Sequence, residues 1–139
     1  MNIKSIVENF EQAQNDLNNK LNHLKRYFAD EEKLWIEYEK LDDAFFLNDK
    51  AMSFLCDSLQ QVDQKDHLAL NDLQDIKYLY KLLAEYYPYN IQYQEDLIAF
   101  VYNVLDDEAE ALLLIDKTER RIESARKYLG KIRKEIKNK

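Results

Sequence analysis

The first part of the chain carries apolar residues at steps of three and four, which is the spacing of one helix face. The series forms a heptad seam, interrupted only by Gln14, with apolar members Ile3, Val7, Phe10, Leu17, Leu21, Leu24 and Phe28. Such a seam is typical of a coiled coil or a long bundle helix. Ser5 and Glu8 have the spacing of a capping box at its start.

The seam continues through Trp35 and Tyr38 to Phe45. We therefore expect one long N-terminal helix that runs to about residue 47. Residues 30–32 are all acidic, and acidic residues favour the positive N-terminal end of a helix. A fresh helix beginning near Asp30 is thus the alternative.

Two shorter amphipathic helices are predicted in the middle of the chain. Asn48 and Asp49 supply the cap signal of the first, which ends in the polar run of residues 63–67. Asn71 with Gln74 suggests the cap of the second. Pro88 ends it, because proline lacks an N–H and disfavours helical angles at the residue before it. The predicted apolar faces are Met52, Leu55, Leu59 and Val62, then Leu73, Ile76, Leu79, Tyr80, Leu83 and Tyr87.

The last helix is predicted to begin after Asn90, an N-cap residue, and to continue almost to the end of the chain. A helix of about 45 residues would be about 70 Å long. The apolar spacing shifts register near Ile115, and Gly130 lies inside the pattern, where it weakens a helix by about 1 kcal/mol relative to alanine. The apolar positions are Ile91, Leu97, Ile98, Val101, Leu105, Leu112, Ile115, Ile122, Ala125, Leu129, Ile132 and Ile136.

Composition agrees with an all-helical protein. The 139 residues include one glycine and one proline, whereas sandwiches, barrels and phosphate-cradling loops need glycine at several positions. We expect one all-α domain over residues 1–139, an elongated antiparallel bundle with long, coiled-coil-like terminal helices and two shorter middle helices. An apolar seam left exposed on a long helix would be covered by a second copy, so a homodimer is expected.

Charge divides the chain unevenly. The net charge is −7, yet residues 117–139 hold ten basic and three acidic residues, a net charge of +7, and the remainder carries −14. An acidic body argues against nucleic-acid binding by the protein as a whole. The basic C-terminal segment either lies along the acidic body or contacts a polyanion, a nucleic acid or lipid. A single cysteine, no secretory signal and no run of about 20 apolar residues predict a cytoplasmic protein.

The sequence contains few residues in a pattern that would support catalysis or metal binding. Cys56, His23 and His67 lack a glycine-rich oxyanion loop, and Asp63 with His67 would make two ligands at most. We expect no cofactor and no enzyme activity. One alternative remains open: Glu8 and Glu11, then Glu39 and Asp42, have a spacing similar to the Glu-x-x-Glu … Glu-x-x-Asp pattern of all-helical nucleotide pyrophosphohydrolases. That resemblance implies Mg²⁺-dependent hydrolysis, and it requires the first helix to break near Asp30.

Tyrosine is concentrated around Pro88, where six occur in sixteen residues: Tyr78, Tyr80, Tyr86, Tyr87, Tyr89 and Tyr93. Tyrosine is enriched in protein interfaces because it buries a large ring while its hydroxyl keeps a hydrogen bond. A second candidate is the acidic run near residue 108, which is either a docking patch for a cationic partner or a solvated helix face. The predicted partner-binding residues are Tyr86, Tyr87, Tyr89, Tyr93, Asp106, Asp107, Glu108 and Glu110.

These features together predict a non-enzymatic protein–protein interaction module of the adaptor, chaperone or toxin-neutralising type. Its partner is expected to be another protein with a basic surface, and contacts with membranes or nucleic acids are the lesser alternative.

Overall fold

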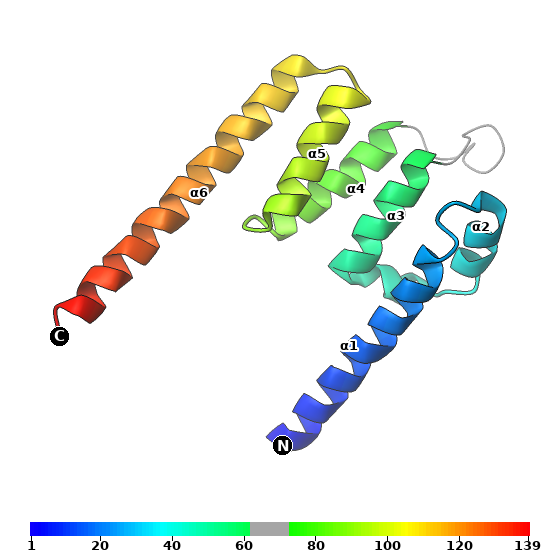
Figure 1. Cartoon of the computed structure of the whole chain (residues 1–139), viewed down its shortest axis with the longest axis horizontal. Helices are drawn as coiled ribbons and strands as arrows, with labels where there is room; N and C mark the ends of the chain where they lie inside the picture. The colour runs from blue at the N-terminus through cyan, green and yellow to red at the C-terminus, as the bar shows by residue number, and fades with distance from the viewer. Residues whose placement is uncertain (62–72) are drawn as a thin grey trace. The chain divides into compact units, whose positions relative to one another are not determined.

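A computed structural model describes residues 1–61 and 73–139, and within these ranges every regular element is a helix (Figure 1). The elements are α1 (Ile3–Lys25), α2 (Glu31–Glu39), the 3₁₀ helix η1 (Asp43–Leu47), α3 (Asp49–Gln61), α4 (Leu73–Tyr86), α5 (Ile91–Asn103) and α6 (Glu108–Lys137). The all-α prediction is confirmed. The predicted end of the first middle helix at Val62 and the polar run of 63–67 lie outside the described residues, as does the predicted Asn71 cap.

Residue contacts divide the chain into two compact units, Met1–Asp63 and Gln64–Lys139, and each is described by itself. The single domain expected over residues 1–139 stays a prediction.

Asparagine and aspartate caps begin six of the described helices. In each, the side-chain oxygen of the residue before the helix accepts the backbone N–H three residues further on, which satisfies one of the unpaired donors of the first turn. The capping residues are Asn2, Asp30, Asp42, Asn48, Asn90 and Asp107. The caps at Asn48 and Asn90 confirm two sequence predictions. The first helix begins after Asn2, so the capping box predicted from Ser5 and Glu8 is wrong.

The long N-terminal helix expected to reach residue 47 is wrong. α1 ends at Lys25, and α2 begins at Glu31 after the cap made by Asp30, whose side chain accepts from the N–H of Lys33 at 3.3 Å. The fresh start at Asp30 was the stated alternative. The apolar spacing runs on through the break because the residues after it rejoin the same core.

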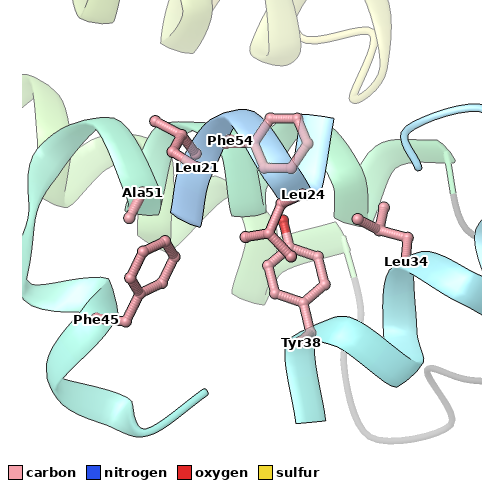
Figure 2. Close-up of a cluster of buried hydrophobic side chains, with 7 residues drawn as sticks. All are labelled: Leu21, Leu24, Leu34, Tyr38, Phe45, Ala51 and Phe54. Carbon is pink, nitrogen blue, oxygen red and sulfur yellow. The ribbon is translucent and has the colours of Figure 1, made fainter. Parts of the chain in front are cut away.

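The core of the first unit is a cluster of aliphatic and aromatic side chains from α1, α2, η1 and α3 (Figure 2). Its members are Leu21, Leu24, Leu34, Tyr38, Phe45, Ala51 and Phe54. The buried Tyr38 hydroxyl lies 2.8 Å from the Ser58 hydroxyl, which itself donates to the Phe54 carbonyl at 2.8 Å. Because the Ser58 hydroxyl has one hydrogen and donates it to that carbonyl, the Tyr38 hydroxyl is the donor in its bond to Ser58. Burial raises the pKa of Tyr38.

The buried face of α3 agrees with the predicted one at Leu59 and differs from it at Met52 and Leu55. Met52 and Leu55 are only partly buried, and the fully buried positions are Ala51, Phe54, Cys56, Ser58 and Leu59. The buried face therefore includes Ala51, Phe54 and Ser58, which the predicted apolar series left out.

In the second unit, α4 ends at Tyr86, just before Pro88, as predicted. The proline leaves the Ala84 carbonyl without its usual partner, because residue 88 has no N–H to donate four residues back. The buried Gln94 of α5 supplies the donor: its amide nitrogen lies 2.9 Å from the Ala84 oxygen and 3.2 Å from the Tyr87 oxygen. The Gln94 side chain thus links the C-terminal end of α4 to α5 by hydrogen bonds.

The C-terminal helix of about 45 residues is also wrong, because the chain turns between α5 and α6. Asp106 has a φ of 52°, a left-handed conformation that aspartate tolerates better than most residues. Asp107 then caps α6 by accepting from the N–H of Glu110 at 3.0 Å. The turn sends α6 back alongside α5 (Figure 1).

Candidate interaction surface

An apolar groove lies between α5 and α6, with a volume of about 530 Å³. Its lining residues are Glu95, Ile98, Ala99 and Tyr102 from α5 and Glu108, Ala111, Leu112 and Ile115 from α6. Most of these side chains are apolar, while the carboxylates of Glu95 and Glu108 are exposed beside them. Leu112 is 55% exposed and Tyr102 is 54% exposed, so a large apolar area faces outward here.

The turn of residues 104–107 builds this groove. Backbone N–H groups of Leu105 and Asp107 donate to the carbonyls of Phe100 and Val101 at 3.2 and 3.1 Å, which closes the end of α5. The cap on Asp107 then starts α6 immediately, so the two helices leave the turn side by side.

The acidic residues between positions 106 and 110 have different structural roles. Asp106 forms the turn and Asp107 caps α6, so both act locally. Glu110 lies 2.6 Å from the Lys77 ammonium and ties α6 to α4. Glu108 lines the groove. Asp106, Asp107 and Glu108 are nevertheless exposed, and their role in binding a partner stays a prediction.

The tyrosine cluster divides into exposed and buried members. Tyr86 and Tyr89 are 77% and 67% exposed, and Tyr87 is 41% exposed. Tyr93 is only 6% exposed and packs edge-on against Tyr87, with ring centroids 5.8 Å apart, so it supports the turn and is not available to a partner. Tyr80 is buried and packs against Phe100, with ring centroids 5.3 Å apart.

The two predicted clusters lie at opposite ends of α5. The tyrosine turn precedes α5 and the acidic turn follows it, and a helix of 13 residues is about 20 Å long. Sequence reasoning missed the groove itself, because it assigned Ile98, Leu112 and Ile115 to the core face. The signal was present in the run Leu112–Ile115, whose four consecutive apolar residues cannot all face one side of a helix.

The carboxylates of the hydrolase alternative are not gathered into a metal site. The required break near Asp30 exists, yet no group of three or more metal-ligating side chains occurs among residues 1–61 and 73–139. Asp42 caps η1 through the N–H of Phe45 at 3.3 Å.

The nucleophile candidates are likewise placed in packing and pairing positions. Cys56 is fully buried. His23 lies 3.2 Å from Glu37, whose pKa is lowered first by its hydrogen bond with Lys40 at 2.9 Å and also by His23. His67, with Asp63, lies outside the described residues.

The basic segment 117–139 forms most of α6 and carries exposed apolar side chains. Leu129 and Ile136 are 61% and 66% exposed.

Comparison with known proteins found no matching family, no matching curated protein and no matching solved structure. Within the described ranges, none of the helices has both the length and the apolar character needed to span a bilayer.

Proposed function

We propose that this chain is a non-enzymatic protein-binding module whose α5–α6 groove receives a basic amphipathic helix of another protein. The observation that carries the proposal is the groove itself: an open apolar strip between two helices, with Glu95 and Glu108 exposed beside it. Amphipathic helices bind such grooves by burying one apolar face.

Charge complementarity selects the class of partner. Lysines or arginines flanking the apolar face of the incoming helix would meet Glu95 and Glu108, while an acidic helix would be repelled. The net charge of −7 favours the approach of a basic partner. Tyr102 supplies an exposed aromatic ring at the groove, a residue type enriched among binding hot spots.

The experiment uses a fluorescent synthetic helix with leucines at i, i+3, i+4 and i+7 and flanking lysines, and measures anisotropy at increasing protein concentration. Leu112→Lys removes an apolar contact and adds a like charge, so we expect about tenfold weaker binding or more. Leu113→Lys is the matched control, because Leu113 is 70% exposed and does not line the groove. A peptide with glutamates in place of the lysines should bind more weakly, and added salt should reduce the difference.

Equal weakening by the two leucine variants would contradict the proposal, and so would equal affinity for the two peptides. The exposed tyrosines offer a separate contact: Tyr86→Ala with Tyr89→Ala tests whether a natural partner also reaches the turn. The Mg²⁺-dependent hydrolase receives no support from the geometry of the described carboxylates.

A further inference from the structure

α6 extends well beyond the helix against which it packs. α5 has 13 residues and α6 has 30, so their lengths are about 20 and 45 Å. Ala111, in the first turn of α6, is its one fully buried residue, and the C-terminal part continues past α5 (Figure 1). This part is helical to Lys137 although Ile122, Leu129 and Ile136 are exposed.

The exposed part of α6 keeps a regular heptad pattern. Steps of three and four connect its core positions without interruption: Ile115, Thr118, Ile122, Ala125, Leu129, Ile132 and Ile136. Heptad position a is isoleucine or leucine throughout, at Ile115, Ile122, Leu129 and Ile136. Heptad position d is occupied by Thr118, Ala125 and Ile132. Such a pattern is characteristic of a helix that pairs with another helix.

We propose that residues 118–136 of α6 pair antiparallel with the same segment of a second copy, across a two-fold axis at position 127. In this register Ile122 opposes Ile132 of the second copy, and Leu129 opposes Ala125. Thr118 opposes Ile136. Two of these three layers set a large side chain against a small one, which is the complementarity that close helix packing needs.

Charge on the flanking positions fits the same register. Positions e and g border an antiparallel seam, and each faces its own kind on the other helix. Glu119 meets Arg133 of the second copy, and Arg121 meets Glu135. Symmetry doubles both pairs, so the interface is self-complementary. At the axis Tyr128 faces its own copy and so does Arg126, and the Arg126 pair is the one like-charge contact among these flanking positions.

Other arrangements lose these pairs. Sliding one helix by a heptad in either direction leaves at least one of Glu119 and Glu135 without an arginine. A parallel pair would bring Arg121 toward Arg126 of the second copy. The remaining basic residues of α6 occupy positions b, c and f, which point away from the seam: Lys117, Arg120, Lys127, Lys131, Lys134 and Lys137.

Sedimentation equilibrium of the full chain tests the proposal. The mass should rise from 16.7 kDa to about twice that value as concentration increases. Leu129→Asp places a charge in the seam and should raise the dimer dissociation constant about tenfold or more. Leu113→Asp is the matched control, because Leu113 is exposed at position f. Far-UV circular dichroism should show that both variants remain helical.

A charge exchange tests orientation and register together. Glu119→Arg should weaken the dimer, and adding Arg133→Glu should restore it, since only the antiparallel register joins these two positions. A chain that stays monomeric at millimolar concentration overturns the proposal. Leu129→Asp that lowers the stability of a monomer also overturns it, because the stripe would then be covered within one chain. Neither result bears on the α5–α6 groove.

Discussion

Replacing Gln94 by leucine tests how the chain stabilises the end of α4. Leucine is similar in size to glutamine but donates nothing, so it leaves the Ala84 and Tyr87 carbonyls without the bonds of 2.9 and 3.2 Å that Gln94 provides. A hydrogen bond contributes about 0.5–1.5 kcal/mol, so losing two should cost about 1–3 kcal/mol. At an m-value of about 2 kcal/mol/M, the urea midpoint would fall by about 0.5–1.5 M.

The matched control is Gln92→Leu on the same helix. Gln92 is exposed and bonds only Asp96, one turn along, so its replacement should change the free energy of unfolding by no more than about 0.5 kcal/mol. Urea unfolding followed by far-UV circular dichroism compares the two variants.

Pro88→Ala makes the test specific to the mechanism. It returns an N–H at the position that normally serves the Ala84 carbonyl, so Gln94→Leu should cost less in that background. An equal cost in both backgrounds, or equal midpoints for Gln94→Leu and Gln92→Leu, would refute the assignment of Gln94 as the substitute donor.

Three further predictions concern stability and are checked by chemical unfolding. Gly130→Ala should stabilise the chain by up to about 1 kcal/mol, because the added methyl meets nothing within 4 Å in mid-helix; a loss of stability would mean that this face is packed. Asp107→Ala should cost about 1 kcal/mol through loss of the α6 cap, whereas Asp107→Ser should retain most of it; equal losses would show that the cap is not what matters there. Tyr38→Phe should cost about 1 kcal/mol at neutral pH, through the lost bond to Ser58. Because burial raises the pKa of Tyr38, its stabilisation is complete below the unfolded pKa of about 10 and declines as pH rises above it. The gap between wild type and Tyr38→Phe should therefore shrink in alkali, measured by Trp35 fluorescence, and a constant gap would contradict the assignment.

The sequence was sufficient for the fold class and for the helix ends marked by a single strong residue. Asn48, Pro88 and Asn90 act as predicted, because a cap or a missing N–H works within three or four residues. Helix continuity was mispredicted twice, at Asp30 and at Asp107. In both places the apolar spacing continues across the break, and periodicity cannot distinguish one helix from two that share a core. In each case the sequence signal for a new helix was an aspartate followed by glutamates, which is the usual composition of an N-cap and first helical turn.

The surface was harder to predict than the fold. Spacing shows which helical residues share a face, but not which neighbouring helix covers that face. Tyr80 and Tyr93 are buried while Tyr86 and Tyr89 are exposed, although all four lie near one proline. Leu112 was assigned to the core because it fits an apolar series, yet it lines the groove between α5 and α6 and is 55% exposed.

The acidic residues of this chain fall into two groups: some cap helices, and others are exposed where a partner could bind. With one glycine and one proline, the chain makes its helix starts with asparagine and aspartate, and Asp30, Asp42 and Asp107 each accept a backbone N–H. These carboxylates are engaged by the fold itself. Glu95 and Glu108 have no such capping role, and both lie beside exposed apolar side chains. A docking surface needs charge and apolar area in the same place, so the groove is a better basis for the choice of partner than the net charge of −7.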